Sequence, residues 1–425
     1  MIRTRFARSI RLIVSILAGC SRSTVEDTAT NDAPQSSPMT TTTNACGGTE
    51  TLPAGPNEAC GVCGLYACSS QNVLRCDDPG ANTCGICGKI PQEECNGRDD
   101  NCNGVIDEGC VLKLAALRTN DQQARVSGTR VVFRAAGYWS NASDVGLVLL
   151  PGFNLEIVSP HAEPTDGPGD PSQELDPDID GELVVWTSRR VDPLSDVGTL
   201  VGYDARTKTS FLISSLATTH PAVSKARVAF ETKGTSEYED DIMLWERATG
   251  STRTLTDKTT DDRAPDLDGE WVVFTQGSGV SPYFNRQVVA YNLTTDERLV
   301  LSDGLGGWNT QPAISGTRAV WRHEEGNQAP SYYGEIWLYD LTTHTRTKLS
   351  LEKKDEYPRI SGSLVCWSTI SGEPGGITLL DVSSGRRKTL SSEGSICDID
   401  GRRVVWSEYH GSNDVYVREL LENEP

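Results

Sequence analysis

The chain has 425 residues, and its 59 acidic residues outnumber its 39 lysines and arginines, so that its formal net charge is −20. A protein this acidic repels nucleic acids and anionic lipid headgroups, and neither is an expected partner. Ten of the thirteen cysteines lie between Cys46 and Cys110, which divides the chain into parts of different composition.

The chain begins with MIRTRFARSIRLIVSILAGC, in which four arginines precede or enter a short apolar run. This arrangement is typical of an export signal, and the apolar run is too short to cross a membrane as a helix. Its end, Leu17-Ala18-Gly19-Cys20, resembles the lipobox of bacterial lipoproteins, in which the signal is removed and the cysteine carries lipid. The other interpretation is an ordinary secretory signal followed by a chance cysteine.

The lipobox resemblance implies a location for the protein. It assigns residues 1–19 to the signal peptide and the lipid to Cys20. Ser21 stands where an aspartate would favour the inner membrane, so the resemblance implies an outer-membrane lipoprotein, on the periplasmic face or at the cell surface. No later stretch is apolar enough to span a bilayer, so the lipid would be the only membrane attachment.

Residues 20–45 are the cysteine and a segment rich in Ser, Thr, Pro, Asn and Asp. Such a segment has too few apolar side chains to offset the entropy lost on ordering. We therefore expect a disordered tether between the lipid and the folded parts.

Residues 46–110 hold an even number of cysteines in a chain that carries an export signal, which predicts a small disulfide-rich module. Cys60 and Cys63, with Cys84 and Cys87, also fit the spacing of a zinc ribbon. The oxidising compartment and the cysteines interleaved between these two pairs favour disulfides. The sequence does not specify which cysteines pair.

Within this module, residues 93–110 read EECNGRDDNCNGVIDEGC. From Asp99 onward they match the D-x-[DN]-x-[DN]-G pattern with which a calcium-binding loop begins. Alternate side chains of a tightly curled loop point inward, and Gly104 permits the sharp turn. Hard oxygen ligands suit calcium rather than zinc or copper. The predicted ligands are the Val105 carbonyl oxygen and the side chains of Asp99, Asn101, Asn103, Asp107 and Glu108.

The same stretch departs from an EF-hand, because Cys110 occupies the position of the usual bidentate glutamate. It resembles the metal-binding motif of MopE-type bacterial surface proteins, and this resemblance implies a calcium cofactor. The alternative is that Asp and Asn side chains cap turns in a disulfide-bonded knot.

From Val111 onward a repeat replaces the cysteines. Each repeat contains an apolar run that ends in an aromatic residue, and these aromatic residues are 39 to 53 positions apart. The aromatic residues are Phe133, Trp186, Phe230, Phe274, Trp321, Trp367 and Trp406. Each repeat offers about four short strands separated by Gly, Ser and Thr, which is typical of a propeller blade. The sequence therefore predicts an all-β fold, a seven-bladed β-propeller over 111–425.

The ends of the propeller also predict how it closes. The last repeat has no room for its fourth strand, and residues 111–118 resemble the end of a blade. We expect this N-terminal strand to complete the last blade and remove the open sheet edges.

The repeated pattern, as in "ISGTRAVW" followed by "EIWLYDLTTHTRTKLS", resembles the TolB-like propellers of bacterial and archaeal surface proteins. The resemblance covers nearly all of 111–425. It implies the fold but no single function, because propellers support many chemistries.

Several repeat residues have structural interpretations. Strand-ending residues are expected to cap turns, namely Asp204, Asn292, Asp340 and Asp381. The aromatic series is expected to pack between blades. Cys366 and Cys397 are expected to be buried as small apolar groups, with a disulfide between neighbouring blades as the alternative.

One position of the innermost strand is expected to face the central channel. Its charged members are Arg125, Asp178, Asp266, Arg359 and Asp398, and two others are Ala222 and Ala313. The charges alternate in sign from the sixth repeat through the seventh to the second. They form either structural ion pairs or a site for a small charged ligand.

Loops after the second strand of the repeats carry aromatic residues that predict a binding face. Its members are Tyr138, Trp139, Tyr283, Phe284, Tyr332, Tyr333 and Tyr409. Exposed Tyr and Trp suit an envelope or extracellular protein or glycan, because they bury a large area at low entropic cost. Packing beneath long loops is the alternative.

The sequence lacks the G-x-S-x-G and H-E-x-x-H motifs of hydrolases and zinc proteases. The favoured hypothesis is a non-catalytic recognition propeller. The alternative is an extracellular polysaccharide hydrolase or lyase, with His323 and His410 in equivalent loops as its candidate residues.

Overall fold

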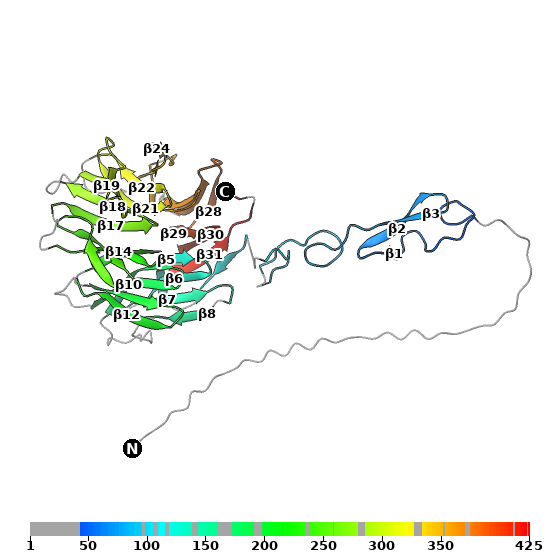
Figure 1. Cartoon of the computed structure of the whole chain (residues 1–425), viewed down its shortest axis with the longest axis horizontal. Helices are drawn as coiled ribbons and strands as arrows, with labels where there is room; N and C mark the ends of the chain where they lie inside the picture. The colour runs from blue at the N-terminus through cyan, green and yellow to red at the C-terminus, as the bar shows by residue number, and fades with distance from the viewer. Residues whose placement is uncertain are drawn as a thin grey trace, which may run out of the picture. The chain divides into compact units, whose positions relative to one another are not determined.

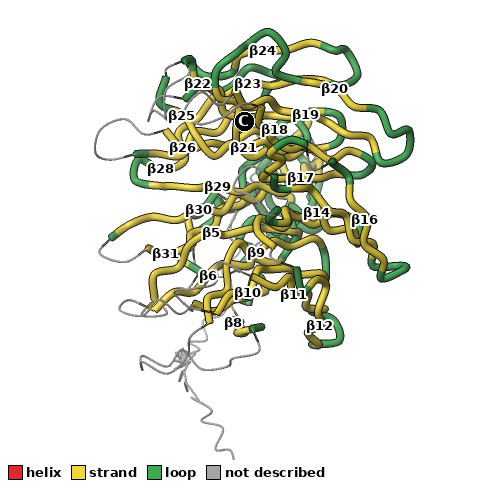
Figure 2. The backbone as a smooth tube through the Cα atoms, turned by 90° about the vertical axis from the view of Figure 1, so that its left-hand side faces the viewer, coloured by secondary structure: helices red, strands yellow, loops and turns green. Residues whose placement is uncertain are grey.

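The computed structural model shows two compact units, Met1–Ala81 and Asn82–Pro425. The residues that it describes are 43–95, 98–104, 109–114, 119–137, 143–152, 154–159, 172–190, 198–216, 218–234, 239–257, 259–278, 285–326, 334–351, 353–369, 375–410, 413–422 and 424–425. The predicted signal peptide and Cys20 lie outside these residues. Strands and turns make up all the regular structure in the described ranges (Figure 2), so none of them contains a helix that could cross a membrane.

The first unit contains a three-stranded antiparallel sheet (Figure 1). Its strands are β1 (Ala59–Cys60), β2 (Gly64–Ser70) and β3 (Val73–Asp77). Apolar side chains such as Leu65 and Val73 are about half exposed, so this sheet has little hydrophobic core. Two disulfides, Cys46–Cys68 and Cys60–Cys76, hold it instead, as is usual for small exported modules.

The disulfide framework predicted for 46–110 is confirmed. All ten cysteines of this segment are disulfide-bonded, which excludes a zinc ribbon. Two of the bonds, Cys84–Cys102 and Cys95–Cys110, lie within the second unit. The second bond ends one residue before the first strand of the propeller.

The second unit is a β-propeller built from antiparallel four-stranded groups. Two eight-stranded sheets each consist of two such groups, joined by a single parallel pair, Ser143–Gln173 in one and Arg286–Trp308 in the other. The first contains β5 (Thr119–Ser127), β6 (Arg130–Gly137), β7 (Ser143–Leu149), β8 (Asn154–Ile157), β9 (Ser172–Asp180), β10 (Leu183–Arg190), β11 (Gly198–Asp204) and β12 (Thr209–Ser214). The second contains β17 (Asp261–Asp268), β18 (Trp271–Ser278), β19 (Asn285–Asn292), β20 (Arg298–Val300), β21 (Trp308–Ser315), β22 (Arg318–Glu324), β23 (Glu335–Asp340) and β24 (Thr345–Lys348).

Three further sheets have four strands each. The first contains β13 (Thr218–Ser224), β14 (Arg227–Thr232), β15 (Asp241–Glu246) and β16 (Ser251–Thr254). The second contains β25 (Asp355–Ser361), β26 (Leu364–Thr369), β27 (Gly376–Asp381) and β28 (Arg387–Ser391). The third contains β29 (Gly394–Asp400), β30 (Arg403–Tyr409), β31 (Asn413–Glu419) and β4 (Val111–Lys113). The all-β propeller fold is therefore as predicted, whereas the number of seven blades stays a prediction.

The second strand of each group is buried on both faces, because a neighbouring group covers each side. Its seven aromatic residues, from Phe133 to Trp406, are all fully buried, which confirms that they form the packing core. Turn capping is confirmed as well. The side chain of Asp340, for example, accepts hydrogen bonds from the backbone N–H groups of Thr342 (2.9 Å) and Thr343 (3.2 Å). Asp204, Asn292 and Asp381 do the same in their turns.

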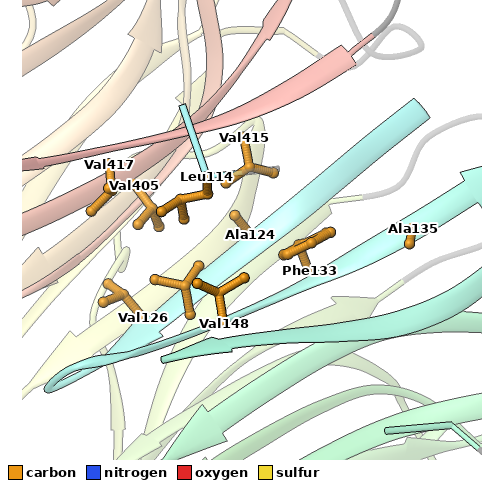
Figure 3. Packing of buried hydrophobic residues seen from close by; sticks show 10 residues of the cluster. Leu114, Ala124, Val126, Phe133, Ala135, Val148, Val405, Val415 and Val417 are labelled. Carbon is orange, nitrogen blue, oxygen red and sulfur yellow. The ribbon is translucent and has the colours of Figure 1, made fainter. Parts of the chain in front are cut away.

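The predicted closure by the N-terminal strand is confirmed. β4 pairs with β31 antiparallel, and Figure 1 shows β29, β30 and β31 beside β5 although these strands come from opposite ends of the propeller sequence. Backbone contacts extend this pairing, with the Gly109 N–H donating to Glu419 O (2.7 Å) and the Leu114 N–H to Val415 O (2.8 Å). Leu114 packs among Val405, Val415 and Val417 of the last group and Ala124, Val126 and Phe133 of the first (Figure 3).

The prediction of two separate apolar thiols was wrong. Cys366 on β26 and Cys397 on β29 form a disulfide, and both residues are fully buried. Their strands belong to adjacent groups and share one hydrophobic cluster, with the two Cα atoms 6.4 Å apart. Packing of neighbouring groups thus brings the two sulfur atoms within bonding distance.

Candidate ligand site in the propeller channel

Every second residue at the end of the first strand of each group lines one cavity of about 600 Å³. These residues form three rows. The rim row is Gln123, Asp176, His220, Ala264, Gln311, Tyr357 and Ile396. The middle row is Arg125, Asp178, Ala222, Asp266, Ala313, Arg359 and Asp398. The turn row is Ser127, Asp180, Ser224, Asp268, Ser315, Ser361 and Asp400. The structure therefore brings all five charged channel residues of the sequence prediction around one space.

The turn row links each group to the next by a side-chain hydrogen bond. Most of these links end on the backbone N–H of the following turn, as from Gly181 to Ser127 Oγ (2.9 Å) and from Gly316 to Asp268 Oδ2 (2.7 Å). The Gly128 N–H donates to Asp400 Oδ2 (2.6 Å), which returns the series to β5. The remaining links are Lys225 to Asp180, Ser224 to Asp268, Gly362 to Ser315 and Gly401 to Ser361. Hydrogen bonds of short polar side chains thus link all the strand groups around the channel into a closed ring.

The rim row follows from a β-bulge that the sequence analysis missed. The pairing shifts in each first strand, as between Gln122 and Arg125, and every rim residue has φ between 48° and 55°. Positive φ is uncommon for residues other than glycine, and a bulge redirects the side chains that follow it. The available signal was the proline that follows five of these seven residues. The bulges place the rim side chains at the channel.

The aspartates of the middle row each bridge to the next group. The N–H groups of Val126, Val223 and Ile314 donate to Oδ2 of Asp398, Asp178 and Asp266 at 2.8, 2.7 and 2.8 Å. One oxygen of each of these carboxylates therefore accepts a hydrogen bond from the backbone of the next group.

Two arginines lie beside two of these aspartates. Arg125 Nε is 3.8 Å from Asp178 Oδ1, and Arg359 Nε is 3.7 Å from Asp398 Oδ1. Burial raises the pKa of Asp178 to about 7, although the positive charge of Arg125 opposes this shift. Burial also raises the pKa of Asp398 and lowers the pKa of Arg359. The middle row is a largely buried, charged layer in which the paired groups are close but not in hydrogen-bond contact.

The rim holds a second charged pair that the sequence did not reveal. His220 Nδ1 lies 3.2 Å from Glu231 Oε2, and the Ala264 N–H donates to the same oxygen (3.1 Å). The His220 side chain is 55% exposed to the channel, while Glu231 is buried. Burial opposes protonation of the imidazole, but the hydrogen bond to Glu231 and the charge of Asp176 raise the pKa of His220 to about 9. His220 therefore carries a positive charge at neutral pH.

Most of the predicted aromatic face lies outside the described residues, namely Tyr138, Trp139, Tyr283, Phe284, Tyr332 and Tyr333. Tyr409 ends β30 and is 65% exposed.

The two histidines of the enzyme alternative face different surroundings. His323 is 3% exposed and its Nδ1 donates to Asn309 Oδ1 (3.0 Å). Its role is therefore a structural one in the interior. His410 is exposed and lies 3.0 Å from Glu408 Oε2. The structure does not place either of them on the channel wall.

Only part of the predicted calcium loop is described, because Val105, Asp107 and Glu108 lie outside the described residues. Asp99 accepts hydrogen bonds from the N–H groups of Asn103 (3.1 Å) and Gly104 (2.8 Å), and Asn101 accepts one from Asn103 (3.1 Å). These side chains therefore cap a turn, as the second interpretation expects. Oxygen donors of this kind fit calcium, since a carboxylate oxygen can accept more than one contact. No three His, Cys, Asp or Glu side chains in the described ranges converge on one metal position.

Comparisons with known proteins support the fold. No protein-family model matches the chain, and no curated protein matches its sequence. The β-propeller domain of the Trilobed protease from Pyrococcus furiosus is 10% identical over 72% of this chain and 99% of that chain, with a TM-score of 0.54. Oligogalacturonate lyase from Vibrio parahaemolyticus is 11% identical over 74% of this chain and 94% of that chain, with a TM-score of 0.55.

TolB from Acinetobacter baumannii is also among the structural neighbours. It is 17% identical and has a TM-score of 0.44, and the match covers 63% of this chain but 65%, just under two thirds, of the TolB chain. At such identities the two neighbours with TM-scores above 0.5 establish the propeller fold alone.

Proposed function

We propose that this protein is an outer-membrane lipoprotein, anchored through Cys20, whose propeller recognises an envelope or extracellular protein or glycan without catalysing a reaction. Residues 20–45 serve as the tether, and the disulfide-rich module separates the tether from the propeller. The export-signal pattern and the lipobox resemblance support this location, and the propeller channel supports recognition.

The observation that carries the recognition function is the channel of about 600 Å³ with its charged middle row. Arg125 and Arg359 each donate one hydrogen bond, to the backbone carbonyl of the residue before them, at 3.1 and 3.2 Å. The other N–H groups of these guanidiniums make no hydrogen bond with any described residue and are available to a ligand. Concave sites of this volume with a few polar groups are typical of ligand pockets.

A second candidate function is cleavage of an extracellular polysaccharide, as a hydrolase or a lyase. The observation that favours it is the pair of His220 and Glu231 at the rim, because a histidine oriented by a buried carboxylate is a common acid–base arrangement. An imidazole with a pKa of about 9 is already protonated at neutral pH, however, and is a poor general base. This charge state disfavours a reaction in which His220 takes up a proton.

Affinity capture from envelope extracts tests the recognition function. The immobilised protein is compared with R125Q/R359Q and with a control, R318Q, which removes an arginine that pairs with Asp340 outside the channel. We expect a protein or glycan that the parent and R318Q retain and the double variant loses. Equal retention by all three would remove the channel from the proposal.

The enzyme alternative is tested with a panel of polysaccharides. Conversion of any of them by the protein, lost in His220→Gln, would replace recognition by catalysis. The predicted aromatic face is tested in the same capture with Tyr283, Phe284, Tyr332 and Tyr333 changed to Ala. Leu212, 63% exposed on β12, is the control for loss of an exposed apolar side chain.

Calcium binding by the 99–108 loop is proposed as well. Asp99, Asn101 and Asn103 would supply side-chain oxygens from the described part of the loop. Bound calcium would cross-link turns of the disulfide-rich module and would take no part in the channel.

A further inference from the structure

The channel carries an excess of negative charge. Seven aspartates line it, against two arginines and one histidine. Burial makes the negative charge of the three middle-row aspartates, Asp178, Asp266 and Asp398, unfavourable, because a carboxylate in a low-dielectric space lacks the hydration that it has in water. A ligand that brings positive charge would reduce this cost. The following inference rests on the proposal that the channel binds a ligand.

Charge compensation in the middle row follows a rule with one exception. In both close pairs, the arginine comes from the first strand of the preceding group. Arg125 on β5 lies beside Asp178 on β9, and Arg359 on β25 lies beside Asp398 on β29. The strand that precedes Asp266 is β13, and its middle-row residue is Ala222. The third aspartate therefore lacks the partner that the other two have.

The contacts of Asp266 agree with this pattern. No lysine, arginine or histidine nitrogen of the described residues lies within 4 Å of its carboxylate. Its Oδ2 accepts the Ile314 N–H at 2.8 Å, and burial raises the pKa of the carboxyl, with the more distant charge of Arg359 opposing the shift. The carboxylate is thus held in place by the wall but is not neutralised by it.

The neighbours of Asp266 leave room on the cavity side. The middle-row residues on both sides are alanines, Ala222 and Ala313, and the rim residue of the same strand is Ala264. These side chains end at Cβ, so none can reach the carboxylate with a donor. The space that an arginine side chain fills beside Asp178 is left to a ligand beside Asp266.

We propose that the channel binds a ligand with a protonated primary amine, which takes the place of the absent arginine and donates to the carboxylate of Asp266. An ammonium group fits better than a divalent metal, since a metal needs several convergent ligands and no three acidic, His or Cys side chains of the described part converge on one point. A hydrogen bond between two charged groups is also stronger inside a protein than in water.

Isothermal titration calorimetry, which measures the affinity of the protein for small amines, tests this proposal. The probes are cadaverine, glucosamine and N-acetyl-lysine amide, which carry the ammonium on a diamine, an amino sugar and a peptide-like side chain. The neutral control ligand is 1-pentanol. The protein is compared with D266N, which keeps an oxygen for the Ile314 N–H, and with D296N as the matched control, because Asp296 is exposed in the turn between β19 and β20 and does not line the channel.

We expect at least one amine to bind, D266N to weaken its binding at least tenfold, and D296N to leave its affinity within about threefold. The tightest probe identifies the source of the amine. A second variant, A222R, supplies the missing arginine without removing the carboxylate, in a row where two other strands already carry arginine. It should also weaken binding at least tenfold.

Three results would overturn the proposal: no binding of any amine, equal binding of cadaverine and 1-pentanol, or unchanged binding in D266N and A222R. Recognition by the channel is judged separately, by the capture experiment with R125Q/R359Q. Capture that depends on the two arginines without amine binding would indicate an anionic ligand, which leaves the proposed function intact and refutes the amine.

Discussion

The disulfide between Cys366 and Cys397 makes the most direct prediction about stability. The perturbation is the double variant C366A/C397A, in which both buried sulfur atoms are lost. The bond closes a loop of 31 residues. The chain-entropy relation gives about 4 kcal/mol for a loop of this length, because the bond restricts the unfolded chain. We therefore expect the free energy of unfolding of the propeller to fall by about 4 kcal/mol.

Guanidinium denaturation without reductant, followed by tryptophan fluorescence, measures this loss. Repeating the titration of both proteins with reductant supplies the control, because the unfolded wild-type chain is then no longer cross-linked. The difference between wild type and variant should shrink by more than half. Both proteins share the disulfides of residues 46–110, so reduction of those bonds affects the two alike.

A thiol assay gives the result that would refute the reasoning. Both sulfur atoms are fully buried, so neither residue should react with iodoacetamide in the folded protein, and neither should react after unfolding without reductant. Alkylation of Cys366 or Cys397 on unfolding alone would show that the two thiols are separate. An unchanged free energy of unfolding in the double variant would show that the bond does not restrain the chain as calculated.

Three further predictions follow from other parts of the structure. Leu114→Ala should cost about 3 kcal/mol of unfolding free energy and speed hydrogen exchange in β4 and β31, since Leu114 is buried in the closing cluster; a similar cost for exposed Leu212→Ala would contradict this. The pKa of Asp178 is raised to about 7, so the folded protein holds this proton more tightly and loses stability as the pH rises from about 4 to 7. Asp178→Asn should remove up to about 4 kcal/mol of that pH dependence. If the unfolding free energies of the two proteins change equally between pH 4 and 8, this prediction is wrong. Millimolar calcium should raise the melting temperature of the protein but not of Asp99→Ala. An unchanged melting temperature of the parent protein would refute calcium binding.

The sequence predicted those features that repeat with a single period. Trp321 and its equivalents are large and apolar at the same position of each repeat, so their burial between blades could be predicted without any coordinates. The middle row was also predicted, because Asp178, Asp266 and Asp398 occupy one position of the aligned repeats. The strand at Val111 was predicted to close the ring because the last repeat lacked a strand.

Contacts between repeats were not predictable in the same way. The rim row depends on a bulge that turns residues such as His220 into the channel, and the proline that follows most rim residues was its only trace in the sequence. Glu231 on β14 pairs with Thr219, and the bulge between Thr219 and Ala222 brings His220 beside it. The partner of Cys366 was missed for the same reason, since 31 residues separate it from Cys397 and only the packing of adjacent blades brings them together.

The contact between Gly109 and Glu419 means that the propeller begins and ends at the same place. A chain whose ends already touch is nearly circular, and its break could be moved. A circular permutant that joins the last residues to Gly109 through a short linker, and opens the chain in the exposed turn at Gly250, would retain every link of the turn row. Such a permutant would free the propeller from the segment that now precedes Gly109 and allow a fused domain or surface anchor to be attached at a turn of choice.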